Sequence, residues 1–342
     1  MTRVAAALLL LAATPVFGRE PIAQDPLATE IARWSAFVRE TESSDENWKD
    51  LKQGMEPAMA RVEAALKDGR RLLALERLAS VRMNLAGFAY VNSLPENKRG
   101  AADLDAEFAR LEVLRAPGST LEGVRPAAVR AEAEAALPQA RNYYDTSLEY
   151  GRATMPWSGF FYLGVAQAQR DFVAFCRTLS ERTDLEAPPL RSLAPELDAL
   201  EADLLKAYRP PASIDRHSEF IGASAALKEA RELDAAGLRY GALLRYLQAA
   251  MRVFTLRADA PAPDPEGLPA RLEALDTRLR TGKVDHSIGR LYLETAQANP
   301  AFAEAIARDV LPRNFAALTP APASPKKPAP SVTVTLVRWP YT

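Results

Sequence analysis

Apolar residues recur at helical spacing along most of this chain, in stretches separated by Gly, Pro or Asn. The first stretch covers residues 26–40, where Leu27, Ile31 and Trp34 fall on one helix face. A capping signal at 43–46 begins the next, in which Pro57 is expected to kink or restart the helix. Further helices are expected near residues 70–91, 102–115, 124–153, 159–180, 191–208, 217–236, 240–257, 267–281, 284–298 and 300–316. Ala, Leu, Arg and Glu dominate and β-branched residues are sparse, so the sequence predicts an all-α protein.

Residues 1–18 have the pattern of a signal peptide. Arg3 precedes an apolar run at 4–13, and Pro15 and Gly18 precede the charged Arg19. The run is about half of the roughly 20 residues that span a bilayer, so it predicts cleavage on export and no membrane anchor. No cysteine stands at the cleavage region, which argues against a lipid anchor. The mature chain is therefore expected in the periplasm or outside the cell.

Charge and cysteine usage exclude several classes of protein. The chain has 43 Lys and Arg against 44 Asp and Glu, a formal net charge of −1, which gives no reason to expect a nucleic-acid partner. Cys176 is the only cysteine, so no intramolecular disulfide can form. Its apolar surroundings, FVAFC, predict a buried side chain.

The C-terminal residues differ in character from the helical body, which is expected to cover residues 19–318. Residues 319–331, TPAPASPKKPAPS, are rich in proline and predict an extended linker. Residues 332–342, VTVTLVRWPYT, alternate in the manner of a short strand. Three outcomes are open for this tail: it folds back onto the body, it stays disordered, or it docks on a partner through Trp339 and Tyr341.

Two segments, 64–81 and 233–250, share a pattern typical of antiparallel helical hairpins. In each, a helix ends at a glycine, Gly69 or Gly237, and an alanine follows five residues later. Glycine permits the tight turn, and alanine allows two helices to approach closely.

The second segment resembles the tetratricopeptide repeat through Gly237, Ala242, Tyr246 and Ala249. The first segment is a weaker match, and a third echo lies at 292–296 before Asn299-Pro300. The first two copies lack the family's terminating proline, and every copy lacks its tryptophan. The resemblance covers about a third of the chain. It implies stacked helical hairpins, as a solenoid or an irregular bundle, whose concave surface binds a protein segment without chemistry of its own.

The best candidate binding residues lie in an aromatic-rich segment at 142–164. Tyr and Trp side chains combine apolar area with hydrogen-bonding tips, so they suit a pocket for a peptide or a sugar ring. Gly and Pro residues there indicate a turn, with a helix end near the tryptophan; the alternative is that the segment forms the core of a central hairpin. The candidates are Tyr143, Tyr144, Tyr150, Arg152, Trp157 and Phe161.

The sequence contains no recognisable catalytic or metal-binding motif. His217 and His286 each precede a serine and follow an aspartate, Asp215 or Asp285, within two residues. This favours a helix-capping role for the aspartates over a triad whose members come from distant positions. Two isolated histidines and one cysteine give no zinc spacing, so no metal or cofactor is expected. Acidic residues such as Glu132 and Glu134 are plentiful, and their spacing does not favour a glycosidase pair.

Three hypotheses for function remain. The first is a non-catalytic scaffold that binds a protein or peptide in a groove lined by Tyr240, Arg245 and Gln248. The second is a helical bundle that holds a small ligand near Trp157 and Phe161. The third is a cell-envelope hydrolase, which requires two carboxylates or a Ser–His pair in one cleft.

Overall fold

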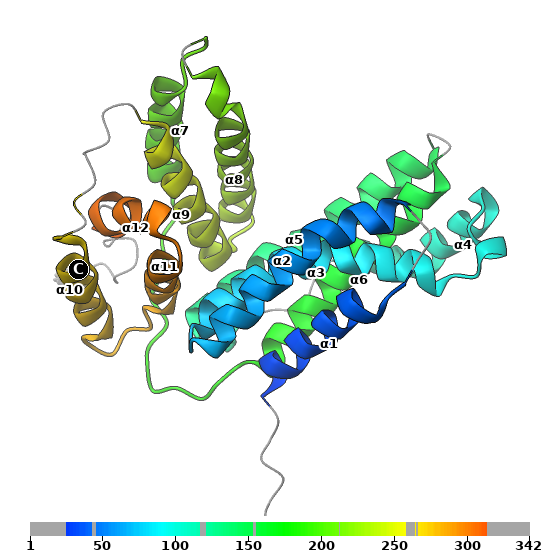
Figure 1. The fold of residues 1–342 in the computed structure, drawn as a ribbon, viewed down its shortest axis with the longest axis horizontal. Coiled ribbons are helices and arrows are strands. Elements are labelled where there is room, and N and C mark those ends of the chain that lie inside the picture. Colours follow the sequence, from blue (N-terminus) through cyan, green and yellow to red (C-terminus); the bar gives the residue numbers. More distant parts are fainter. Residues whose placement is uncertain are drawn as a thin grey trace, which may run out of the picture.

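The protein is all-α, as the sequence predicts (Figure 1). The computed structural model describes residues 25–42, 46–116, 121–152, 155–211, 213–257, 264 and 266–312 of the 342-residue chain. Within these ranges twelve α-helices pack against one another and no sheet forms. The predicted signal peptide at 1–18, the linker at 319–331 and the strand-like tail at 332–342 lie outside the described residues.

The first six helices form one end of the molecule, here called the N-terminal half (Figure 1). They are α1 (Pro26–Glu40), α2 (Glu46–Lys67), α3 (Arg71–Ser93), α4 (Ala101–Leu111), α5 (Ala127–Arg152) and α6 (Pro156–Thr178). Helix α2 runs as one helix through Pro57, so the expected restart at this residue does not occur. Helix α6 begins next to Trp157, which places this residue at a helix end as expected.

The remaining helices form the C-terminal half, which stands beside α3 and α5 (Figure 1). They are α7 (Ala194–Ala207), α8 (His217–Ala235), α9 (Arg239–Leu256), α10 (Leu268–Arg280), α11 (Ser287–Ala298) and α12 (Pro300–Ala305). A π-helical turn, Ile306–Val310, continues α12. An isolated parallel bridge between Glu186 and Val284 joins the segment before α7 to the segment before α11.

Two of the hairpins, α2–α3 and α8–α9, turn at the glycines that the sequence pattern identifies. Gly69 and Gly237 have φ angles of 75° and 77°, a left-handed conformation that glycine adopts without steric cost. The N–H of Arg70, which follows Gly69, donates to the Ala65 carbonyl at 2.9 Å. The N–H of Leu238, which follows Gly237, donates to the Leu233 carbonyl at 2.9 Å. These bonds close each first helix in the same way. The resemblance to the tetratricopeptide repeat itself stays a prediction.

The second helix of each hairpin is capped by a glutamate from a distant helix. The residues before α3 and α9, Arg70 and Leu238, provide no side-chain cap. Instead, Glu294 of α11 accepts from the Leu73 N–H at 2.9 Å. Glu134 of α5 accepts from the N–H groups of Tyr240 and Gly241 at 2.8 and 3.0 Å. A carboxylate at this position accepts hydrogen bonds from backbone N–H groups that have no partner within the helix, and its negative charge interacts favourably with the positive end of the helix dipole. Each hairpin is thereby fixed to a distant helix of the fold.

Helix α5 begins against the segment that leads into α11. The Asp285 carboxylate accepts from the Ala127 N–H at 2.6 Å and from the Ser287 N–H at 3.0 Å. The Ser287 hydroxyl accepts from the Ala128 N–H at 2.9 Å. The predicted capping role of Asp285 is therefore confirmed, and the residue caps a distant helix in addition to its own.

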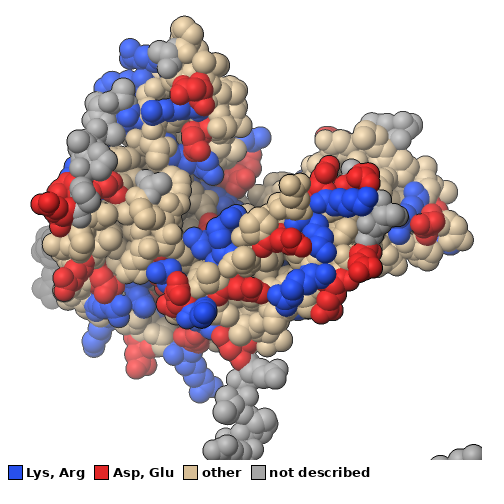
Figure 2. Space-filling view, viewed as in Figure 1, with Lys and Arg blue, Asp and Glu red and all other residues tan. Residues whose placement is uncertain are grey.

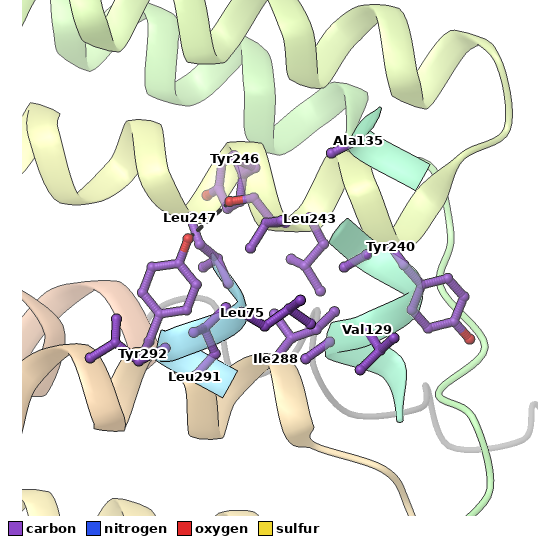
Figure 3. Close-up of a cluster of buried hydrophobic side chains, with 14 of the residues drawn as sticks. Leu75, Val129, Ala135, Tyr240, Leu243, Tyr246, Leu247, Ile288, Leu291 and Tyr292 are labelled. Atoms are coloured by element: carbon purple, nitrogen blue, oxygen red, sulfur yellow. Dashed lines mark hydrogen bonds between the residues drawn. The ribbon is translucent and has the colours of Figure 1, made fainter. Parts of the chain in front are cut away.

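A continuous apolar core joins the two halves. Leu75 of α3, Val129 of α5 and Leu243 of α9 meet Ile288 and Leu291 of α11 in one buried cluster (Figure 3). In the same cluster the Tyr292 hydroxyl donates to the Leu244 carbonyl at 2.9 Å. Because residues far apart in sequence share this core, burial of its apolar surface stabilises both halves together.

A smaller cluster fills the space where α4 packs on α5 and α6. Leu104 and Phe108 of α4 pack there against Tyr144 and Phe160. Trp157 and Phe161 border both clusters, so they connect this end of the N-terminal half with the main core.

Candidate functional site

Three residues of the predicted aromatic cluster pack within the N-terminal half. Tyr144 is buried, and its hydroxyl donates to the Phe108 carbonyl at 2.8 Å. Trp157 stacks on Phe161 with ring centroids 5.4 Å apart, and the Phe161 ring covers Gly87 of α3 closely. These contacts correspond to the alternative in which the cluster forms the core of a hairpin, here α5–α6.

The other two tyrosines of the cluster flank Tyr162. The Tyr143 and Tyr150 rings stack on it at centroid distances of 6.0 and 5.0 Å. Tyr150 is exposed, whereas Tyr143 is partly buried and lines a cavity. Burial raises the pKa of Tyr143, the negative charge of Glu229 adds to the shift, and Arg245 opposes it. Tyr143 is therefore the member of the cluster that reaches a candidate binding site.

The remaining predicted residues have different positions. Tyr240 is buried, its hydroxyl donates to the Pro188 carbonyl at 2.7 Å, and the Arg130 guanidinium lies 4.4 Å from its ring centroid. It therefore does not line the groove in which the first hypothesis places it. Arg245 lines the same cavity as Tyr143. The side chain of Arg152, and Trp339 as a whole, lie outside the described residues.

The cavity lies between the two halves and measures about 370 Å³. Side chains of α3, α5 and α6 form one wall, and side chains of α8 and α9 form the other. We call it the interhelical cavity; Figure 2 shows in space-filling form how the two halves rise on either side of a recess. Its volume is at the lower end of the range for small-molecule sites, about 300–1,000 Å³. Its polar lining includes Glu76, Ser80, Glu132, Gln139, Tyr143, Gln169, Glu229, Arg245, Gln248 and Arg252.

Glu132 is the most unusual group of this lining. Its side chain is 5% exposed, and its Oε1 atom has no hydrogen-bond partner. Burial raises the pKa of Glu132 to about 8, the nearby charge of Glu76 adds to the shift, and Arg245 opposes it. At neutral pH this shift favours the protonated form of the carboxyl group.

Glu76 contributes a second carboxyl group from α3. Burial raises its pKa, while the charges of Arg245 and Arg77 and a hydrogen bond from Gln248 oppose the shift. That bond, from the Gln248 Nε2 to Glu76 Oε1, is 3.3 Å long and is therefore weak. The interhelical cavity thus contains two carboxyl groups whose solvation is poor and whose partners are few.

The arginines of the interhelical cavity are already paired. Arg245 Nε lies 2.9 Å from a Glu229 oxygen, and Arg245 Nη1 donates to Gln248 Oε1 at 2.7 Å. Arg252 Nη1 lies 3.0 Å from a Glu219 oxygen at the rim. Both cations therefore have a carboxylate nearby, and the lining contains one buried donor without a hydrogen-bond partner, Arg245 Nε, besides the unpartnered Glu132 Oε1.

Comparison with protein-family models, with curated proteins and with solved structures found no match.

Two further searches covered the part of the chain that the structure describes. No helix there has both the length and the apolar character needed to cross a bilayer. No three or more His, Cys, Asp or Glu side chains in these ranges come together as ligands for a metal ion.

The two histidines lie apart from the interhelical cavity. His217 starts α8, and its Nδ1 is 2.8 Å from the Tyr208 hydroxyl on the surface. His286 is buried between Asp285 and Ser287, whose side chains both cap α5. The Asp-His-Ser sequence at 285–287 therefore closes a helix end.

Sequence reasoning did not single out Glu76 or Glu132. A local signal for Glu132 exists in the run Ala127–Ala136. The residues three and four positions away on the same helix face are Ala128, Val129, Ala135 and Ala136. A charge surrounded by small apolar residues on its own helix face indicates a charge turned toward a close helix contact.

Proposed function

We propose that the protein is an exported, non-catalytic binding protein that holds a small organic molecule in the interhelical cavity. The observation that carries this proposal is the convergence of polar side chains from five helices on one cavity of about 370 Å³. Recognition sites for small molecules are concave, and their polar groups fix the orientation of the ligand. Apolar lining is supplied here by Met83, Phe172 and Met251.

The two halves supply opposite walls, which suits a ligand bound between them. Tyr143 and Arg245 belong to the sequence-predicted binding residues, and both line this cavity. The proposal therefore keeps the small-ligand hypothesis and moves its centre from Trp157 and Phe161 to the junction of α5 with α9. Export rests on the sequence of residues 1–18.

A screen of small polar molecules by thermal shift tests this function. A ligand at a concentration of 100 times its Kd stabilises the folded chain by about 2.7 kcal/mol, which gives a clear rise in Tm. Ala226 of α8 lines the cavity, so Ala226→Phe should fill the space and abolish the rise. Ala235→Phe, on an exposed position of the same helix, should leave the rise intact. Ligands that stabilise the wild type and the Ala226→Phe variant equally would refute the proposed site.

The hydrolase hypothesis needs two carboxyl groups in one cleft, and Glu76 and Glu132 do line one cavity. A glycosidase pair requires environments that separate the two pKa values, so that one group stays ionised while the other donates a proton. Burial instead raises the pKa of both groups. A hydrolytic role for this pair stays a prediction.

A protein partner remains the second candidate function, at a different surface. Leu205 of α7, Ile214 in the 3-10 turn before α8 and Ile221 of α8 are 62%, 58% and 51% exposed at the same end of the α7–α8 pair. Apolar side chains grouped on a surface are typical of contact sites. Pull-down from the exported fraction should lose its partner when Leu205 and Ile221 are replaced by serine. A second comparison, with a chain that ends at Leu318, tests the predicted docking tail.

A further inference from the structure

Glu132 differs from the other buried acids of the described residues. Four acidic side chains there are less than a tenth exposed: Glu132, Glu134, Asp234 and Asp285. Glu134 and Asp285 accept from backbone N–H groups at helix starts, and Glu134 also lies 2.8 Å from Arg130. Asp234 accepts from the Leu193 N–H at 3.1 Å and from the Ser192 hydroxyl at 2.6 Å. Only Glu132 among these four has a carboxyl oxygen without a partner.

An unpartnered carboxyl oxygen is costly inside a protein, and Glu132, which has one, is among the residues that line the interhelical cavity. A hydrogen-bond donor that enters this cavity would supply the missing partner. Arg245 contacts Glu229 through its Nε and Gln248 through its Nη1. Since Glu76 has only a 3.3 Å bond from Gln248, a second acceptor in the same cavity also lacks a strong donor.

The chemistry of these groups selects the class of ligand. A primary ammonium group carries three donors and one positive charge, and it can serve two carboxylates at once. The apolar side chains of Met83, Phe172 and Met251 line the cavity and suit a short hydrocarbon or aromatic body attached to the ammonium group. An anionic ligand would instead share the cavity with the carboxyl groups of Glu76, Glu132 and Glu229.

We propose that the interhelical cavity binds a small organic amine, whose ammonium group is held by the carboxylates of Glu132 and Glu76. This inference rests on the proposed small-molecule function and deepens it.

Amine binding is coupled to a proton. The raised pKa of Glu132 favours its protonated form at neutral pH, so an ammonium ion that binds its carboxylate releases that proton to solvent. The apparent affinity therefore rises with pH up to about 8, by as much as tenfold for each pH unit for one released proton. The titratable and charged groups that act on Glu132 or share its cavity from the surrounding helices are Glu76 (α3), Tyr143 (α5), Cys176 (α6), Glu229 (α8), Arg245 and Arg252 (α9) and Tyr292 (α11).

Calorimetric titration of the full chain tests the proposal with butylamine, 2-phenylethylamine and 1,4-diaminobutane. Each amine is paired with the alcohol of the same shape, which lacks the charge. We expect binding of at least one amine, at least tenfold tighter than its alcohol, with proton release at pH 7 that disappears near pH 9. N-acetyl-lysine methylamide, which mimics a lysine side chain within a polypeptide, is titrated in the same way. If it binds more tightly than the free amines, the natural ligand is a lysine of a polypeptide; if it binds more weakly, the natural ligand is a small metabolite.

Variants separate the specific site from general charge effects. Glu132→Gln keeps the shape of the side chain and should weaken amine binding at least tenfold and remove the pH dependence. Glu76→Gln should weaken binding without removing the proton release. Glu149→Gln removes the same charge from an exposed position of α5 and should change neither property. Circular dichroism spectra of each variant verify that it is folded.

Three results would overturn the proposal: equal affinity for amines and alcohols, unchanged affinity in Glu132→Gln, or displacement of the amine by calcium or magnesium ions at equal concentration. If amines fail while other ligands stabilise the wild type but not Ala226→Phe, the proposed function stands and the amine assignment falls. If every ligand fails, both fall.

Discussion

The strongest prediction concerns the pH dependence of stability in Glu132→Gln. The pKa of Glu132 is about 8 in the fold against 4.5 for a solvated glutamate. Below pH 4.5 the group is protonated in both the folded and the unfolded chain, so it contributes no pH dependence there. Between pH 4.5 and 8 the unfolded chain releases the proton while the folded chain retains it, and the free energy of unfolding falls.

The size of this effect follows from the shift. A difference of about 3.5 pKa units at 1.36 kcal/mol each corresponds to about 5 kcal/mol, lost in full above pH 8. Glutamine has no proton to lose, so the variant escapes this loss. We therefore expect wild type and Glu132→Gln to be of similar stability near pH 4.5. By pH 8.5 the variant should be several kcal/mol more stable.

Urea unfolding followed by circular dichroism at pH 4.5, 6, 7.5 and 8.5 measures the effect. Both proteins must show the same m-value, so that a change in midpoint reports stability. Glu149→Gln serves as the control for a lost surface charge on α5. A difference between wild type and Glu132→Gln that stays constant over this pH range would refute the burial of an unpartnered carboxyl group.

Two further predictions concern backbone contacts between the halves. A Cβ atom at Gly241 would lie 2.9 Å from the Ala135 backbone nitrogen, so Gly241→Ala should force α9 away from α5 and cost about 2 kcal/mol in urea unfolding. Gly54 lies in the interior of α2, and a Cβ atom added there would have no atom within 4 Å, so Gly54→Ala should instead stabilise the fold by about 0.5–1 kcal/mol. Equal effects of the two substitutions on stability would contradict the close packing at Gly241. Asp285→Ala should cost about 2–3 kcal/mol, because the N–H groups of Ala127 and Ser287 lose their acceptor. Faster amide exchange at the start of α5 is the direct readout, and unchanged exchange there would count against the cap.

The sequence predicts local features of this fold well. Gly69 and Gly237 were identified as turn residues because a left-handed turn depends on a single residue and its neighbours. Asp285 was identified as a cap for the same reason. At Pro57 the restart that the sequence allows does not occur, since a proline inside a helix removes one hydrogen bond but packing against neighbouring helices maintains α2 through it.

The interhelical cavity could not be predicted from the sequence, because its walls come from both halves of the molecule. Tyr240 is of a residue type that is common in binding sites. In this fold its hydroxyl group donates a hydrogen bond to the Pro188 carbonyl, and the Arg130 guanidinium lies over its ring. Glu132 and Glu134 are two residues apart and look alike in the sequence. Glu134 caps the start of α9, whereas Glu132 lines the cavity. They differ because each residue along a helix turns the side-chain direction by about 100°. Which face meets which neighbour is decided by long-range packing.

The caps that Glu294 and Asp285 provide have a consequence for how the chain is made. The acceptor of the Leu73 N–H is Glu294, which lies 221 positions later in the sequence. The acceptor of the Ala127 N–H is Asp285, which lies 158 positions later. A ribosome that has completed the N-terminal half has therefore not yet synthesised the groups that close the starts of α3 and α5. Contacts of such long sequence separation slow folding, because a long loop must close before they form. The nascent chain should consequently remain short of its final state until α11 has emerged, and a chain truncated before Val284 should be a good substrate for proteases.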